Sequence, residues 1–193
     1  MKKILIVSAH PSREGKTHSI AEAYKSESEK AGHSVTLLDL YVSENRLPLL
    51  SFETMREWPK SEQQDRMKTL ISDADELVFV HPIWWGTVPA VLKNWIDTIF
   101  EAGFAFRYTH EGKVEKLLTG KTAKVFATCG APAFIYALPI LPFRSFWKTA
   151  VLGFCGVKVT DIQILGSVDK GSEQDRVAGM EKFLEKVRCS ASR

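Results

Sequence analysis

Two adjacent tryptophans, Trp84 and Trp85, stand in a connecting segment at the start of the stretch HPIWWGTVPAVLKNWIDTIF (residues 81–100). Large aromatic side chains contribute most when they are buried, whereas connecting loops run over the surface. An indole at this position suits stacking against a planar heteroaromatic ligand, and Gly86 would let that ligand approach the backbone. We expect Trp85 to form the stacking wall and Trp84 to pack the loop. The alternative interpretation is that both tryptophans pack against the following helix.

A second candidate segment, HPSREGKTHS (residues 10–19), follows an apolar run and leads into a helical pattern. The N-terminus of a helix presents unpaired N–H groups and the positive end of the helix dipole, which together bind phosphate. Hydroxyl groups and a cation are available there from Ser12, Lys16, Thr17 and Ser19. Neither the GxGxxG dinucleotide fingerprint nor the GxxxxGK[ST] P-loop is present. Simple capping of the helix by Thr17 or Ser19 is the alternative interpretation.

A third candidate segment, TCGAP (residues 128–132), follows a later apolar run. A loop that contains glycine can pass close to the edge of the same ligand. Cys129 has no cation or histidine beside it in sequence to stabilise a thiolate, so we interpret it as a small buried side chain. His81 ends a strand and is interpreted as a core residue. Three loops with compatible chemistry favour one shared site more strongly than any single loop does.

These loops require elements that hold them together, and the hydrophobic pattern predicts strands alternating with helices. Continuous apolar runs predict strands buried on both faces of a parallel sheet, whereas apolar residues at helical spacing predict the helices. The predicted strands are 4–7, 34–40, 76–81, 123–128 and 158–165, and the predicted helices are 17–31, 61–74, 88–101, 142–154 and 172–187. Residues 41–59 are expected to be irregular, a short GFAFRY segment precedes a polar stretch at 109–121, and the tail from about Cys189 is expected to be frayed.

The alternation predicts a single doubly wound α/β domain over residues 1–193, with helices on both faces of the sheet. Five parallel strands fit the flavodoxin-like order 2-1-3-4-5. In that order a ligand lies beyond the carboxyl ends of strands 1 and 3, where the unusual residues stand.

Composition and charge argue against several classes of function. The net charge is only +3, with 26 basic and 23 acidic residues spread along the chain, so neither nucleic acid nor a membrane surface is expected as a partner. The apolar stretch 137–155 contains two prolines and two cations, which argues against membrane insertion. Three cysteines without a CxxC pair argue against a metal site or a disulfide framework and predict a cytoplasmic location.

Four segments, AHPSREGKTHSIAEA, HPIWWGTVPAVLKNWIDTIF, GFAFRY and ILGFCG, resemble the flavodoxin-like NAD(P)H:quinone oxidoreductases in order and spacing. The resemblance covers nearly the whole chain, and the block P-x-x-W-x-x-x-P-A-x-L-K-x-W followed by GFAF is too specific to expect by chance. In that family a tightly bound FMN or FAD accepts hydride from NAD(P)H and passes it to a quinone or another electrophile. The resemblance therefore implies FMN, or alternatively FAD, as cofactor and NAD(P)H as electron donor.

The resemblance also implies roles for individual residues. The phosphate and ribityl chain of the flavin would be held by His10, Ser12, Lys16, Thr17 and Ser19. The isoalloxazine ring would be lined by Pro82, Ile83, Trp84 and Trp85, with Gly86 at its edge, and bordered from strand 4 by Thr128, Cys129, Gly130 and Ala131. The substrate cavity over the ring would be formed by Tyr136, Tyr108 and Phe106, the last two often on the partner subunit.

The chain departs from the family pattern at two places. Gly15 stands where relatives have Ser or Thr, so a phosphate contact would fall to backbone N–H groups. The region ALPILPFRS (residues 137–145) offers no histidine, although the animal quinone reductases place one shortly after the position of Tyr136. Quinone as the acceptor is therefore less firmly implied than the flavin.

Two other functions remain open at this stage. One is a flavodoxin-like electron carrier, although such carriers are strongly acidic and lack an aromatic segment like residues 103–108. The other is a regulatory subunit of a potassium-efflux transporter, since relatives of the family occupy that role.

Two further expectations concern assembly and mechanism. The apolar side chains of residues 131–155 would form a large exposed patch on a monomer, and such patches usually mark interfaces. A two-fold homodimer is therefore expected. The chain has one predicted phosphate-binding site, which the flavin would fill. NAD(P)H and the acceptor must therefore use the same exposed flavin face in turn, which predicts ping-pong kinetics.

Overall fold

The computed structural model describes residues 1–54, 57–58, 60–138 and 141–192. Within these residues a five-stranded parallel sheet has the order β2-β1-β3-β6-β7. Its strands are β1 (Lys3–Ser8), β2 (Ser34–Asp39), β3 (Glu76–Pro82), β6 (Thr122–Thr128) and β7 (Lys158–Leu165). Counted along the sheet's own strands this is the order 2-1-3-4-5, so the predicted flavodoxin-like fold is confirmed.

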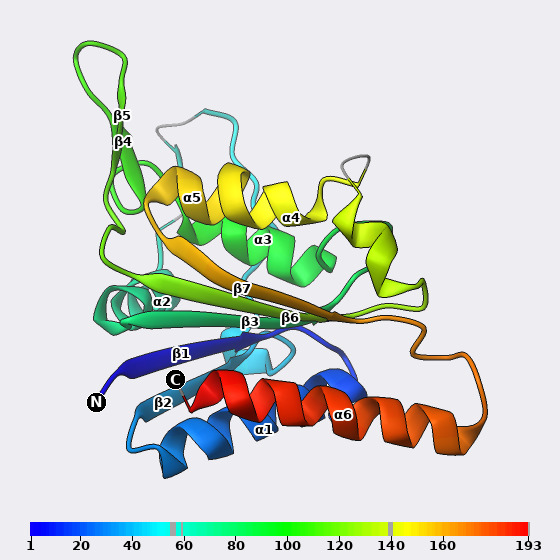
Figure 1. Ribbon diagram of the computed structural model, residues 1–193. Coiled ribbons are helices and arrows are strands. Elements are labelled where there is room, and N and C mark those ends of the chain that lie inside the picture. Colours follow the sequence, from blue (N-terminus) through cyan, green and yellow to red (C-terminus); the bar gives the residue numbers. More distant parts are fainter. Residues whose placement is uncertain (55–56, 59, 139–140, 193) are drawn as a thin grey trace.

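Helices cover both faces of the sheet (Figure 1). The helices α1 (Lys16–Lys30) and α6 (Glu173–Ala191) pack side by side on one face, where they bury Ile4 and Ile6 of β1. The opposite face carries α2 (Glu62–Asp73), α3 (Ala90–Ile99) and the 143–155 helix, and buries Leu5 and Val7. Because neighbouring strand residues point to opposite faces, the continuous apolar strands fill two cores at once.

The predicted helix over 142–154 is present, and its middle is wound as a π-helix. It consists of α4 (Phe143–Ser145), a π segment (Phe146–Val151) and α5 (Leu152–Cys155). An ideal Cβ at Gly153 would lie only 2.0 Å from the carbonyl oxygen of Lys148, five residues earlier. Glycine therefore permits the wider turn, a local irregularity of the kind that recurs near functional sites.

A β-hairpin lies where the sequence predicted only a short segment and a polar stretch. Its strands β4 (Phe106–Tyr108) and β5 (Val114–Lys116) pair antiparallel and project from the body of the domain (Figure 1). Arg107 donates to both carboxylate oxygens of Glu115 at 2.9 and 2.7 Å across the pair. The strands are too short and too polar to give a period-2 hydrophobic signal, so this hairpin was missed.

The prediction of a frayed C-terminal tail is wrong. Helix α6 continues to Ala191, whose side chain is buried. The carbonyl of Ser190 accepts a 2.5 Å hydrogen bond from Nζ of Lys124, and the carbonyl of Ala191 accepts one from Ser28. These donors satisfy carbonyls that a helix end normally leaves open, and so hold the last turn in place.

Shorter elements complete the connections. Residues 41–59 were predicted to be irregular, and the described part of this segment, which leaves out residues 55, 56 and 59, is mostly irregular and contains the 3₁₀ turn η1 (Ser43–Asn45). A second 3₁₀ segment, η3 (Ala133–Ala137), follows β6. Across the described ranges, no helix combines the length and apolar character needed to cross a membrane.

Candidate functional site

A cavity of about 390 Å³ lies at the carboxyl ends of β1, β3 and β6, and we call it the strand-end cavity. All three predicted loops contribute to its lining. Their lining residues are His10, Lys16 and Thr17 after β1, Pro82, Ile83 and Trp84 after β3, and Thr128, Cys129 and Gly130 after β6. Parallel strands end at the same edge of the sheet, which explains why segments so distant in sequence meet here.

The N-terminus of α1 opens into this cavity without a capping side chain. Gly15 is the N-cap residue, and Lys16 and Thr17 form the first turn, which carries no acidic residue. Thr17 is buried and its hydroxyl lies 3.3 Å from that of Thr128, while the hydroxyl of Ser19 donates to the carbonyl of Gly15. The capping interpretation of Thr17 and Ser19 is therefore wrong. The first N–H groups of α1 remain available to an anion in the cavity.

His10 packs against the N-cap and shapes the same wall. Nδ1 of His10 lies 3.0 Å from the backbone nitrogen and 3.1 Å from the carbonyl oxygen of Ser12, so the backbone of Ser12 holds the ring in place. A Cβ at Gly15 would approach Cε1 of His10 to 3.2 Å. Glycine at position 15, one of the departures from the family pattern, thus leaves room for the imidazole. Ser12 itself uses its hydroxyl to accept from the N–H of Glu14 and does not line the cavity.

The two tryptophans occupy different environments in the folded chain. Trp84 and Thr87 exchange two backbone hydrogen bonds of 3.0 Å, and Trp85 (φ 51°) and Gly86 (φ 78°) form the turn between them. Positive φ at both central residues defines a type I′ turn. Trp84 lines the cavity with its ring 6.3 Å from that of His10, whereas Trp85 is 102% exposed and, like Gly86, does not line the cavity.

Phe106 and Tyr108 lie far from the strand-end cavity of their own chain. They belong to the β4–β5 hairpin, which follows α3 (Figure 1). A crossover helix runs antiparallel to the strands, so the end of α3 returns the chain to the opposite edge of the sheet. A single chain therefore does not bring these two aromatics to the site.

Tyr136 and Ala131 do not line the cavity. Tyr136 is buried on η3 with its ring edge-on to Phe143 at 5.8 Å, and burial together with the nearby Cys129 raises its pKa. The carbonyl of Ala131 accepts from the N–H of Ser167 at 2.9 Å, which ties the loops after β6 and β7 together.

His81 and Cys129 are the buried residues that the sequence predicted. His81 is inaccessible to solvent, its Nδ1–H donates to the carbonyl of Pro82 at 2.8 Å, and burial lowers its pKa to about 4. The imidazole is therefore neutral and belongs to the core. Burial raises the pKa of Cys129, whose thiol donates to the carbonyl of Ala131 at 3.2 Å. Neither residue is suited to act as a charged catalyst at neutral pH.

The sequence interpretation missed two lining residues, Val168 and Asp169, which follow β7. A Cβ at Gly166 would lie 2.3 Å from the backbone nitrogen of Ala133, so glycine lets this loop pack directly on η3. A Cβ at Gly130 would lie 3.6 Å from the carboxylate of Asp169. The sequence could have indicated Val168 and Asp169, because they follow a predicted strand that ends at the same edge of the sheet as the others.

Comparisons with known proteins agree with this geometry. A family model described as a flavodoxin-like fold matches residues 2–188. The chain is 34% identical to an FMN-dependent NADH:quinone oxidoreductase of Macrococcus caseolyticus, over 81% of this chain and 83% of that protein. It is 30% identical to the ribosyldihydronicotinamide dehydrogenase [quinone] of Mus musculus, over 97% of this chain and 91% of that protein.

A solved structure supports the same placement. The NAD(P)H:quinone oxidoreductase from Methanothermobacter marburgensis superposes with a TM-score of 0.81 and 27% identity, covering 97% of this chain and 98% of that one. Sequence, fold and the position of the cavity thus agree, and the chain belongs to the flavodoxin-like family that includes these quinone oxidoreductases.

Proposed function

We propose that this protein is an FMN-dependent NAD(P)H oxidoreductase that reduces a quinone or a similar electrophile by two electrons. The observation that carries the proposal is the strand-end cavity, where three loops meet beside an uncapped helix N-terminus. The names of the relatives support FMN as the cofactor, NAD(P)H as the donor and quinones as the acceptors.

The residues present fit a flavin mononucleotide. A phosphate suits the N-terminus of α1, where backbone N–H groups, Lys16 and the hydroxyl of Thr17 are available. Trp84 offers a flat apolar wall for the ring, and Gly130 exposes backbone beside it. The cavity volume of about 390 Å³ falls in the range of small-molecule and cofactor sites.

The protein's own contribution is binding and orientation. A bound FMN would supply the redox chemistry, which is hydride transfer from NAD(P)H to an acceptor that also takes up one proton from solvent. Trp84 and Ile83 would exclude water from one side of the ring, and the loop after β6 would present its backbone to the ring's polar edge. His81 holds no exchangeable charge for this reaction, because its pKa of about 4 keeps it neutral.

We also infer that donor and acceptor bind in succession. Among the described cavities, the strand-end cavity is the one that combines an aromatic wall with the N-terminus of a long helix. NAD(P)H and the acceptor would therefore use the same face of the flavin. Two planar molecules cannot occupy one slot together, so the donor must leave first.

The active form is proposed to be a homodimer in the cytoplasm. Large apolar side chains are exposed both at the cavity end and at the hairpin end of the domain: Trp85, Phe134 and Leu138, and Leu49, Phe52, Tyr108 and Val114. Such patches usually mark interfaces. A partner subunit that places its hairpin over the strand-end cavity would supply Phe106 and Tyr108. The free state of all three cysteines suits a reducing compartment.

Titration of the apoprotein with FMN, FAD and riboflavin tests the cofactor assignment. FMN should bind more tightly than riboflavin, because α1 and Lys16 favour a phosphate. Thr17→Val should reduce the difference between the affinities for FMN and riboflavin. Thr69→Val, on the exposed face of α2, is the matched control and should leave that difference unchanged. Equal affinities for FMN and riboflavin in the unaltered protein would contradict a phosphate seat at α1, and a clear preference for FAD would replace FMN.

A further inference from the structure

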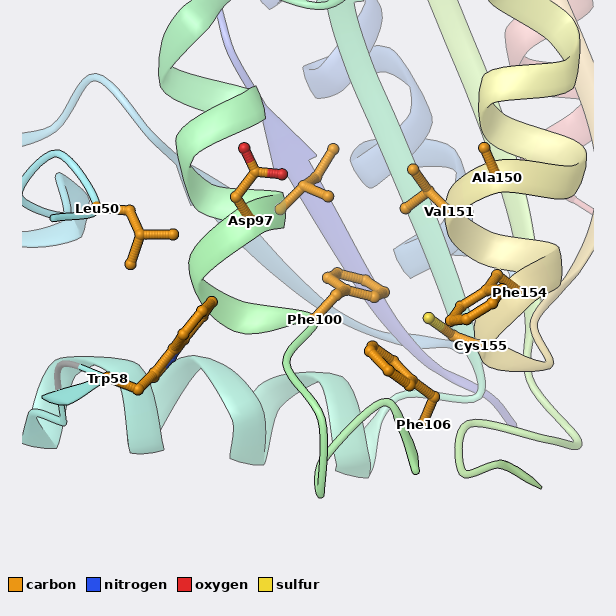
Figure 2. Close-up of a pocket in the computed structure, with 10 residues that line it drawn as sticks. Leu50, Trp58, Asp97, Phe100, Phe106, Ala150, Val151, Phe154 and Cys155 are labelled. Atoms are coloured by element: carbon orange, nitrogen blue, oxygen red, sulfur yellow. The ribbon is translucent and has the colours of Figure 1, made fainter. Parts of the chain in front are cut away.

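An apolar groove of about 400 Å³ lies beside the hairpin, at the opposite end of α3 from the strand-end cavity, and we call it the hairpin groove. Figure 2 shows its side chains, which come from the 41–60 connection, α3, β4 and the 143–155 helix. Its aromatic lining comprises Trp58, Phe100, Phe106 and Phe154. The same groove contains one carboxylate, that of Asp97.

This lining matches an indole ring. An indole has an apolar body that pairs edge-on or offset with aromatic rings, and a single N–H that needs an acceptor when it is buried. Phe106 and Phe154 already form an edge-on pair with centroids 4.9 Å apart, so the groove wall is preformed. Both oxygens of Asp97 accept from Lys93 at 2.7 Å, which fixes the carboxylate, and each oxygen retains a free lone pair.

The chain itself exposes a suitable indole. Trp85 is 102% exposed, although a large aromatic side chain contributes most when it is buried. It also occupies a left-handed backbone conformation, φ 51°, that is uncommon for residues other than glycine. The paired hydrogen bonds of 3.0 Å between Trp84 and Thr87 hold the turn in this shape. A rigid turn that presents a bare indole is what an interface anchor requires.

The two features are placed for reciprocal contact. Trp85 precedes the first turn of α3, whereas Asp97 and Phe100 belong to its end, and the ten residues of the helix span about 15 Å. A two-fold axis through the middle of an exposed helix face pairs the beginning of the helix with its end in the other copy. Each copy would then give one tryptophan and receive one, as an isologous interface demands.

We propose that Trp85 of each subunit inserts into the hairpin groove of a second copy of this chain, where Asp97 accepts the indole N–H. The inference rests on the homodimer proposed above and names the contact that forms it. Because Trp84 adjoins Trp85, the insertion brings Phe106 of the partner subunit beside the strand-end cavity. The dimer contact and the completion of the active site are then one event.

Two substitutions at opposite sides of the contact test this arrangement by sedimentation equilibrium over a range of protein concentrations. Trp85→Asn removes the indole and keeps the type I′ turn, since Asn-Gly is the preferred sequence for it. Ala150→Trp fills the groove from the exposed side of its wall. Loss of a central tryptophan anchor corresponds to at least a 30-fold increase in the dimer dissociation constant. Val177→Arg, at an exposed apolar position on α6, is the control.

We expect both variants to dissociate at concentrations where the unaltered protein and the control remain dimeric. A dimer dissociation constant equal to that of the unaltered protein in either variant would overturn the proposal, because the contact requires both the indole and an open groove. A monomeric unaltered protein would overturn both the inference and the homodimer, and would leave flavin binding to be judged by titration. If both variants weaken the dimer as expected but the unaltered protein does not bind FMN, the inference about the dimer contact stands and the proposed function is rejected.

Discussion

At the scale of single residues, the type I′ turn decides which tryptophan lines the strand-end cavity. Trp84 and Trp85 could not be told apart from the sequence, because both lie in the same loop and share the same chemistry. The distinction depends on positive φ at Trp85 and Gly86, which sends consecutive side chains in different directions. Residue types and strand ends were enough to predict that a site lies here. They were insufficient for the orientation of each side chain.

This assignment makes Trp84 the residue to test. Trp84→Ala should weaken FMN binding by about 1–3 kcal/mol, the usual contribution of one aromatic stacking contact. Trp84→Phe keeps a flat ring and should retain most of the affinity. Quenching of flavin fluorescence during titration of the apoproteins would measure both. An alanine variant with normal FMN affinity and an intact circular dichroism spectrum would remove Trp84 from the site.

At the scale of elements, the sequence predicted the sheet and its helices because apolar periodicity is strong wherever both faces of an element are buried. It failed at the hairpin and at the end of α6, where contacts with distant residues decide the structure. Ser190 illustrates the second case, since its carbonyl is held by Lys124, 66 residues earlier. Periodicity carries no information about such a partner.

Lys124 also links β6 to α1 and β3 through a buried polar network. Its Nζ donates to the hydroxyl of Tyr24 at 2.9 Å and lies 3.4 Å from Glu76, which accepts from the same hydroxyl at 2.5 Å. Burial opposes both charges and lowers the pKa of Lys124. For Glu76, the hydrogen bond from Tyr24 and the charge of Lys124 outweigh burial and hold the carboxyl pKa below its ordinary value.

Removal of this cation should destabilise the fold in a way that depends on pH. Lys124→Met leaves Glu76 buried with one charge partner fewer and should lower the free energy of unfolding by about 3–5 kcal/mol at neutral pH. A carboxyl whose folded pKa is depressed stabilises the fold above its unfolded pKa, and that contribution is lost as pH falls through the folded pKa. The difference between the variant and the unaltered protein should therefore shrink below pH 4.5.

Urea unfolding at several pH values measures this effect. Lys182→Met, at an exposed position on α6, serves as the control and should change stability by less than about 0.5 kcal/mol. A variant of Lys124 as stable as the control at neutral pH would show that the network contributes little.

At the scale of the whole molecule, the residues of the proposed site lie in two separate parts of one chain. The strand-end cavity, which we propose binds the flavin, lies at the carboxyl edge of the sheet, and the aromatics Phe106 and Tyr108 lie at the other edge. The sequence showed that both sets exist. It could not show their separation, because the direction in which α3 returns the chain is a property of the folded crossover.

The central claim is that bound FMN relays hydride between a donor and an acceptor that never meet, and anaerobic mixing tests it most directly. NADH added without acceptor should bleach the visible absorbance of the flavin in a stoichiometric reaction, and the reduced state should persist after the oxidised nucleotide is removed. Subsequent addition of a quinone should restore the absorbance in a separate step, and steady-state double-reciprocal plots should give parallel lines. Flavin that stays oxidised with NADH alone, or lines that converge as in a ternary complex, would contradict the account.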